Sequence, residues 1–199
     1  KRLYLYLKLD RYALLNLIYD LVKSMRLWIG WGNENSELTM ELSDGLRALL
    51  EALVGPGTSL NQATLKEVIS KVPASRLDGH SLIKTDPETR VRHARGQSLP
   101  DWLDMHSGNV DTFPDGVAFP ESTEQVRELL AYARENNLVV IPYGGGTSVV
   151  GHINPVKSSR PKLTIDMGKM SSLLSFDTES QLATFGAGTP GPVVEETLK

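Results

Sequence analysis

Three consecutive glycines, Gly144, Gly145 and Gly146, followed by Thr147 and Ser148, have the clearest chemical potential in this sequence. Because glycine has no Cβ atom, backbone N–H groups in such a loop can approach an anion closely. Successive N–H groups can also form an anion-binding concavity. The two hydroxyl side chains add donors without charge, and the loop contains no lysine. The pattern therefore indicates a phosphate held mainly by backbone dipoles.

The spacing of these glycines differs from the two common phosphate-binding motifs. The sequence has neither G-x-G-x-x-G at a helix start nor G-x-x-x-x-G-K-[ST]. Taken alone, a Gly-Gly-Gly stretch is also typical of a mobile surface turn. The choice between a ligand site and a surface turn therefore depends on the elements that precede the loop.

Those elements form a predicted strand–helix–strand unit. The apolar run Val117–Phe119 predicts the first strand, and Leu138–Ile141 predicts the second. Between them, Ser122 and Gln125 form a capping-box pattern. Apolar residues at helical spacing follow it: Val126, Leu129, Leu130 and Ala133. We expect parallel strands joined by a right-handed crossover, with the loop at the carboxyl end of the second strand, where such sheets bind ligands.

Further helices are predicted before this unit, at Leu42–Val54, Thr64–Lys71 and Leu99 to about His106. Capping patterns mark the last two, Thr64 with Glu67 and Ser98 with Asp101. Glycines stop two of them, at Gly55-Pro56-Gly57 and Gly108. We expect residues 73–90, which are polar, to form an irregular surface connection.

After the glycine loop the pattern changes to short strands, at Leu163–Met167, Leu173–Asp177 and Gln181–Phe185, which predict the start of a second, antiparallel sheet. Gly186-Ala187-Gly188 and Pro190-Gly191-Pro192 interrupt it. Val193–Lys199 reads as the opening of a helix, so we expect this chain to be the front portion of a longer protein.

The composition is that of a folded globular chain. Of 199 residues, 40% are hydrophobic and 23% charged, and the net charge is −3 from 21 basic and 24 acidic residues. Without a basic excess we expect no nucleic-acid partner. The absence of cysteine excludes disulfides, iron–sulfur ligation and thiolate zinc sites here, and fits a cytoplasmic location.

The first 24 residues are rich in Leu and Tyr but are interrupted by charges. No run approaches the roughly 18 apolar residues of a transmembrane helix, so we expect none, and a signal-peptide cleavage site is missing. Two interpretations stay open: an amphipathic helix such as Tyr12–Val22, or an upstream extension before a true start at Met25.

The segment PYGGGTSVVGH resembles the pyrophosphate-binding loop of the vanillyl-alcohol oxidase (PCMH) type of FAD-binding domain. Within that family the sequence is most similar to the alkyl-dihydroxyacetonephosphate synthase-like branch and its bacterial relatives. That closer similarity rests on Trp28–Gly32, on Arg92–Leu99 and on the loop itself. The resemblance covers roughly Trp28 to Lys199 and is tightest from Arg92 to Pro155.

This resemblance implies an α+β fold, in which a small parallel β-α-β subdomain precedes the start of a mixed or antiparallel second subdomain. It implies an N-terminal extension at 1–24, a helical segment at 25–110 and an incomplete FAD-binding domain at 111–199. By the same resemblance, the flavin contacts are Pro142, Tyr143, Gly144, Gly145, Gly146, Thr147, Ser148, Val149, Gly151 and His152. Some relatives attach flavin covalently through a histidine that replaces the last glycine of the triplet. Because that position is Gly146 here, we expect non-covalent FAD.

Two kinds of activity follow from the resemblance: oxidation of a small hydroxy acid or alcohol, or an alkylglycerone-phosphate synthase-like transfer. Catalytic residues are expected C-terminal to this chain, and the full-length protein could be a homodimer. The alternatives are a catalytically silent nucleotide-binding or structural fragment, and another phosphate-binding enzyme that takes a mononucleotide.

Other polar residues have simpler interpretations. His80, His93, His106 and His152 share no metal-ligand spacing, so we expect no metal site. Of the four, only His152 borders the loop and is a candidate flavin or substrate contact. Arg92 and Arg95 could bind a substrate anion, but structural ion pairs are the favoured interpretation. Trp28 and Trp31 could stack on a ligand, although packing of the N-terminal segment is favoured.

Overall fold

The computed structural model describes residues 27–30, 42–77 and 79–199, and the chain divides into two compact units, 1–60 and 61–199. The helix expected at Tyr12–Val22 lies outside the described residues, as does Trp31. In the first unit, helix α2 (Asp44–Val54) begins where Ser43 accepts a hydrogen bond from the N–H of Leu46. It ends at Gly55, which has a φ of 88°, so the predicted stop is confirmed, while the helix begins two residues after the expected Leu42.

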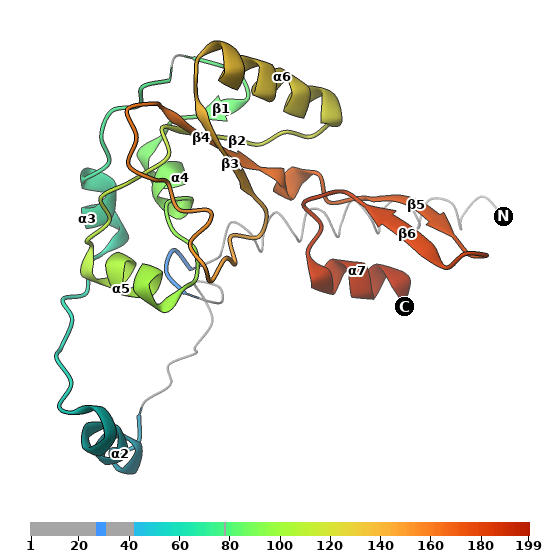
Figure 1. The fold of residues 1–199 in the computed structure, drawn as a ribbon. Helices are drawn as coiled ribbons and strands as arrows, with labels where there is room; N and C mark the ends of the chain where they lie inside the picture. Colours follow the sequence, from blue (N-terminus) through green and yellow to red (C-terminus); the bar gives the residue numbers. More distant parts are fainter. Residues whose placement is uncertain (1–26, 31–41, 78) are drawn as a thin grey trace. The chain divides into compact units, whose positions relative to one another are not determined.

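The second unit is built around a four-stranded sheet in the order β1-β2-β4-β3 (Figure 1). Its strands are β1 (Ile83–Lys84), β2 (Gly116–Ala118), β3 (Val139–Tyr143) and β4 (Lys162–Asp166). Strands β2 and β3 both run parallel to β4, while β1 is antiparallel to β2. The predicted strand–helix–strand unit and its parallel direction are therefore confirmed, and β4 lies between the two strands.

The position of β4 corrects one expectation. We expected Leu163–Met167 to belong to the second, antiparallel sheet, but β4 is the central parallel strand of the first. All five of its residues are buried, as is typical of a strand covered on both faces. The second sheet is the antiparallel hairpin of β5 (Leu173–Asp177) and β6 (Leu182–Phe185), which confirms the other two strands.

Helix α6 (Thr123–Glu135) covers one face of the parallel sheet (Figure 1). Its Leu129 and Ala133 are buried in a core with Leu163 and Ile165 of β4. Leu130, which we placed on the same apolar face, is 48% exposed. The capping box is only half formed, because the Gln125 side chain accepts from the N–H of Glu121 at 2.7 Å instead of the N–H of Ser122.

Residues 73–90 are not the irregular surface connection that we expected. They contain β1 and most of helix α4 (Pro87–Arg92). Asp86 caps this helix by accepting from the N–H of Thr89 at 2.9 Å, and Pro87 occupies its first turn. Proline is favoured at that position because the first-turn N–H groups have no intrahelical partner.

Prolines also begin the last helix of the chain. Helix α7 (Gly191–Leu198) begins inside the Pro190-Gly191-Pro192 stretch that we took for a break, with Pro190 as its N-cap. The two prolines therefore introduce the helix that we expected only from Val193.

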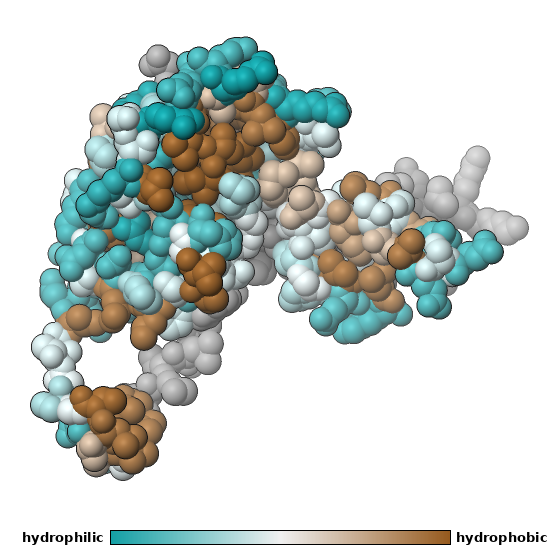
Figure 2. Space-filling view, in the orientation of Figure 1, coloured by the Kyte–Doolittle hydropathy of each residue, from teal (hydrophilic) through white to brown (hydrophobic). Residues whose placement is uncertain are grey.

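Two predicted helices are confirmed with their capping boxes: α3 (Leu65–Ser70) with Thr64 and Glu67, and α5 (Leu99–Ser107) with Ser98 and Asp101. Gly108 closes α5 in the left-handed conformation, at a φ of 69°. Large hydrophobic side chains stay exposed on α2 and on the β5–β6 hairpin, and both regions are brown in Figure 2.

Candidate functional site

The glycine loop leaves the carboxyl end of β3, where Tyr143 pairs with Asp166 at the carboxyl end of β4. The 3₁₀ turn η1 (Met167–Lys169) leaves the same edge and contacts β3. This is the edge at which open α/β sheets bind their ligands. The structure thus gives the loop the surroundings that its sequence context predicted.

The backbone of the loop presents N–H donors that have no acceptor in the described part of the chain. From Gly146 to Gly151, the backbone N–H groups donate to no acceptor within residues 27–30, 42–77 and 79–199. Gly146 and Gly151 have φ values of 70° and 72°, so the chain takes left-handed turns that bring neighbouring N–H groups together. Such a run of free donors fits the oxygens of a phosphate and requires no cationic side chain.

Gly146 is required by its packing as well as by its backbone conformation. A Cβ atom at this position would lie 2.1 Å from the Tyr143 hydroxyl oxygen, far inside contact distance. By contrast, a Cβ at Gly144 would meet nothing within 4 Å. The last glycine of the triplet thus lets the loop fold back over the end of β3.

Tyr143 itself is buried beside His93, and their ring centroids are 4.5 Å apart. The Nδ1 atom of His93 lies 2.7 Å from the carbonyl oxygen of Thr89. Its Nε2 lies 3.0 Å from a carboxylate oxygen of Asp166. Each ring nitrogen thus lies within hydrogen-bond distance of an oxygen, and His93 joins α4, β4 and the base of the loop.

This role for His93 had no signal in the sequence beyond its place in the Arg92–Leu99 stretch. Asp166, its partner, also accepts from the N–H of Gly168 at 2.8 Å and so shapes η1. The two residues are 73 positions apart, and nothing in their local sequence pairs them.

The glycine loop is also held by Gly96 and Gln97, which lie just before α5. The N–H of Gln97 donates to the carbonyl oxygen of Ser148 at 2.5 Å, and the N–H of Gly96 donates to Oδ1 of Asn154 at 2.9 Å. A Cβ on Gly96 would lie 2.4 Å from the Ser148 carbonyl oxygen, so the two backbones touch. Sequence reasoning missed Gly96 and Asn154.

The remaining predicted site residues lie on the exposed side of the loop. Pro142, Gly144, Gly145, Thr147 and Val149 are exposed. Ser148 Oγ lies 3.1 Å from Nδ1 of the exposed His152, so these two polar side chains are brought together.

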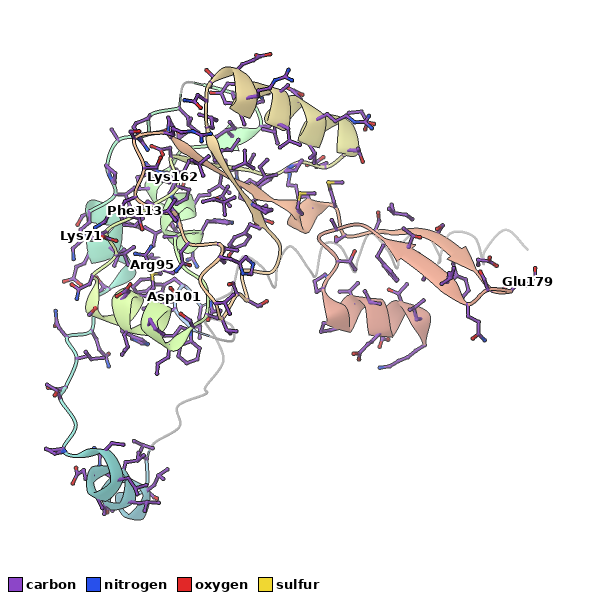
Figure 3. The ribbon with its side chains drawn as sticks, in the orientation of Figure 1. Lys71, Arg95, Asp101, Phe113, Lys162 and Glu179 are labelled. Atoms are coloured by element: carbon purple, nitrogen blue, oxygen red, sulfur yellow. The ribbon has the colours of Figure 1, made fainter. Side chains whose placement is uncertain are left out.

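Arg92 and Arg95 lie in structural ion pairs, the interpretation that we favoured. Arg95, labelled in Figure 3, is buried and donates through Nη1 to the carbonyl oxygens of Ala94 and Thr112. Its Nη2 reaches Asp111 at 3.2 Å. Arg92 pairs with Glu88 on the same helix at 2.9 Å.

A charged cluster lies at the opposite, amino edge of the sheet. Asp115 accepts from Arg76 at 2.7 and 2.8 Å and from the N–H of Lys162 at 2.7 Å. Burial acts to raise the pKa of Asp115, but these hydrogen bonds outweigh it and hold the pKa below its usual value. The cluster joins residues 76, 115 and 162 and lies away from the loop.

None of the helices within residues 27–30, 42–77 and 79–199 is long and apolar enough to cross a membrane. Nor do histidine, aspartate and glutamate residues in the same ranges form a group of three or more that could hold a metal ion.

Comparison with known proteins agrees with this geometry. Residues 114–199 match the family model of an FAD binding domain. The alkyldihydroxyacetonephosphate synthase of Dictyostelium discoideum is 37% identical over 58% of the chain, and that of Trypanosoma brucei brucei is 34% identical over 67%. The mitochondrial D-lactate dehydrogenase [cytochrome] 1 of Saccharomyces cerevisiae is 28% identical over 63%.

A solved structure of an alkyldihydroxyacetonephosphate synthase matches the fold with a TM-score of 0.72, at 26% identity, over 89% of this chain and 39% of that one. The chain spans only 19% and 21% of the two curated synthases. It carries an FAD-binding domain at residues 114–199. In sequence and fold it is similar to the alkyldihydroxyacetonephosphate synthases.

Proposed function

We propose that the glycine loop holds the pyrophosphate of FAD. In this proposal Pro142–Ser148 surround the phosphates, and Val149, Gly151 and His152 continue the wall of the site. The observation that carries it is the run of backbone N–H groups from Gly146 to Gly151, at the carboxyl edge of a parallel sheet, that have no acceptor among the described residues. The bound flavin would supply two-electron redox chemistry, while these residues bind and orient it.

We propose further that the FAD is non-covalent. A side chain at position 146 would have to displace Tyr143, which is itself packed on His93. The glycine that replaces the histidine of covalent relatives is thus part of the packing in this chain. His152 lies further along the loop, against Ser148.

For the complete protein we propose an FAD-linked oxidoreductase of a small hydroxy acid or alcohol, or an alkylglycerone-phosphate synthase-like enzyme. The names of the matched relatives support both activities. We expect the catalytic residues outside this chain, with residues 111–199 as the FAD-binding part behind a helical segment at 25–110 and an extension at 1–24. A small-molecule substrate, a cytoplasmic location and a homodimer complete the proposal.

The first test is the visible absorption spectrum of the purified, desalted full-length protein, followed by acid precipitation. We expect yellow flavin bands that pass into the supernatant, which would justify a substrate screen of hydroxy acids and acyl-dihydroxyacetone phosphate. Flavin in the pellet would contradict the non-covalent assignment. A colourless protein that also ignores added FAD would overturn the site and favour the silent fragment.

A second test isolates the loop. Replacing Gly145 with valine places a branched side chain on the exposed surface of the loop, where its Cβ meets only Thr147, at 3.6 Å. We expect a folded protein that has lost FAD, because the new side chain stands where the phosphate approaches. Undiminished flavin content in this variant would remove the loop from the site.

A further inference from the structure

A short path of hydrogen bonds joins helix α5 to the end of the glycine loop. Asn154 donates from Nδ2 to Oδ1 of Asp101 at 2.5 Å and accepts at Oδ1 from the N–H of Gly96 at 2.9 Å. The other carboxylate oxygen of Asp101 accepts from the Ser98 hydroxyl at 2.6 Å. The Asp101 carboxylate therefore caps helix α5 and also anchors Asn154 at the end of the glycine loop.

The donors and acceptors along this path allow only one orientation of the Asn154 amide. Asn154 presents its NH₂ group to the Asp101 carboxylate, because a carboxylate oxygen accepts hydrogen bonds and an NH₂ group donates them. The amide oxygen then faces the N–H of Gly96, which needs an acceptor. Asp101 lies in the first turn of α5 (Figure 3) and is only 3% exposed, so water cannot easily replace a lost partner.

The same segment also holds the middle of the loop. Gln97 donates its N–H to the Ser148 carbonyl oxygen, and Gly96 lies against that carbonyl without room for a Cβ. The contacts at Ser148 and Asn154 therefore fix the loop on both sides of Val149–Ile153. The free N–H groups near Ser148 and Gly151 keep their directions only while these contacts persist.

We propose that Asp101 is a positioning residue for the flavin: acting through Asn154, it sets the geometry of the glycine loop and thereby the affinity for FAD. This inference rests on the proposed function of the loop. Asp101 itself would touch no part of the cofactor. Its effect passes through one side chain that is 53 positions away in the sequence.

A reciprocal exchange tests this directly in the full-length protein. Asp101→Asn replaces one carboxylate oxygen with an NH₂ group, which faces either the NH₂ of Asn154 or the N–H of Ser98, so a hydrogen bond is lost in either orientation. Asn154→Asp sets two carboxylates against each other. The double variant Asp101→Asn/Asn154→Asp restores all three bonds, with only the bond between positions 101 and 154 reversed in direction. The amide at 101 accepts from Ser98 and donates to 154, while the carboxylate at 154 accepts from Gly96.

The readouts are the Kd for FAD, from flavin fluorescence titration of the apoprotein, and apoprotein unfolding in urea. We expect each single variant to bind FAD about tenfold to a hundredfold more weakly, equivalent to about 1.4–2.8 kcal/mol. The double variant should recover to within about threefold of the wild type. Glu67→Gln is the matched control, because the hydrogen bonds of the Glu67 side chain go to Thr64 within the capping box of α3.

If either single exchange prevents folding, Asn154→Ala replaces it, because that variant leaves the Ser98–Asp101 cap of α5 intact. It should lose FAD affinity to a similar extent. Single variants that bind FAD like the wild type, or a double variant no better than the singles, would overturn the positioning role while the loop site stands. A wild-type protein that binds no FAD at all would overturn both proposals together.

Discussion

Replacing Gly146 with alanine should damage the loop in two separable ways. The φ of 70° places the residue in the left-handed region, which costs a residue with a Cβ about 1–2 kcal/mol. The new Cβ would also lie 2.1 Å from the Tyr143 hydroxyl, and relief of such overpacking costs about 1–3 kcal/mol. Together these costs predict a loss of about 2–5 kcal/mol in the free energy of unfolding.

Two control variants separate these contributions. Gly151→Ala shares the backbone strain, with a φ of 72°, but its Cβ meets only the Asn154 amide, at 3.3 Å. It should cost about 1–2 kcal/mol. Gly144→Ala meets nothing within 4 Å and has no positive φ, so its stability should stay within about 1 kcal/mol of the wild type.

The assay is urea denaturation of the apoprotein followed by measurement of retained FAD after desalting. We expect Gly146→Ala to be the least stable of the three and to lose flavin because the displaced Tyr143 shifts the loop. If Gly146→Ala were as stable as Gly144→Ala, the steric argument for this glycine would be refuted. If Gly146→Ala and Gly151→Ala lost the same free energy of unfolding, backbone strain would explain both losses and the clash with Tyr143 would contribute nothing.

Three further predictions concern the parts of the fold that hold the site. Thr164→Val should leave stability unchanged or raise it by up to about 1 kcal/mol in urea denaturation, because the buried Thr164 hydroxyl has no partner among the described residues; a clear loss would contradict this. Asp115→Asn should cost about 2 kcal/mol at pH 7, because the carboxylate holds Arg76 and the Lys162 N–H. The folded-state pKa of Asp115 is lowered, so its contribution is complete above the unfolded pKa of about 4 and is lost as pH falls through the folded pKa; acid titration of both proteins should show that the variant lacks this loss. Leu129→Ala should cost about 2–5 kcal/mol against less than about 1 kcal/mol for exposed Leu130→Ala, and equal values by thermal unfolding would contradict the packing of α6.

The sequence alone determined the features whose causes lie within a few residues. Ser98 with Asp101 and Thr64 with Glu67 form their capping boxes over three residues, so the pattern can be read directly. The glycine triplet predicted an anion-binding loop because the properties of such a loop come from missing Cβ atoms. Local signals were missed where Pro87 and Pro192 occupy the first turns of helices, since we expected an irregular connection at 73–90 and a helix only from Val193.

Tertiary structure alone decided which distant segments meet. Strand β4 reads as an ordinary short strand, and only its burial on both faces makes it the centre of the parallel sheet instead of a member of the antiparallel one. The pairs His93–Asp166 and Asp101–Asn154 join residues 73 and 53 positions apart. Such contacts depend on how whole elements pack, and a local pattern does not encode them. The residue types of the glycine loop can therefore be read from the sequence, whereas the long-range contacts that hold the loop depend on the tertiary structure.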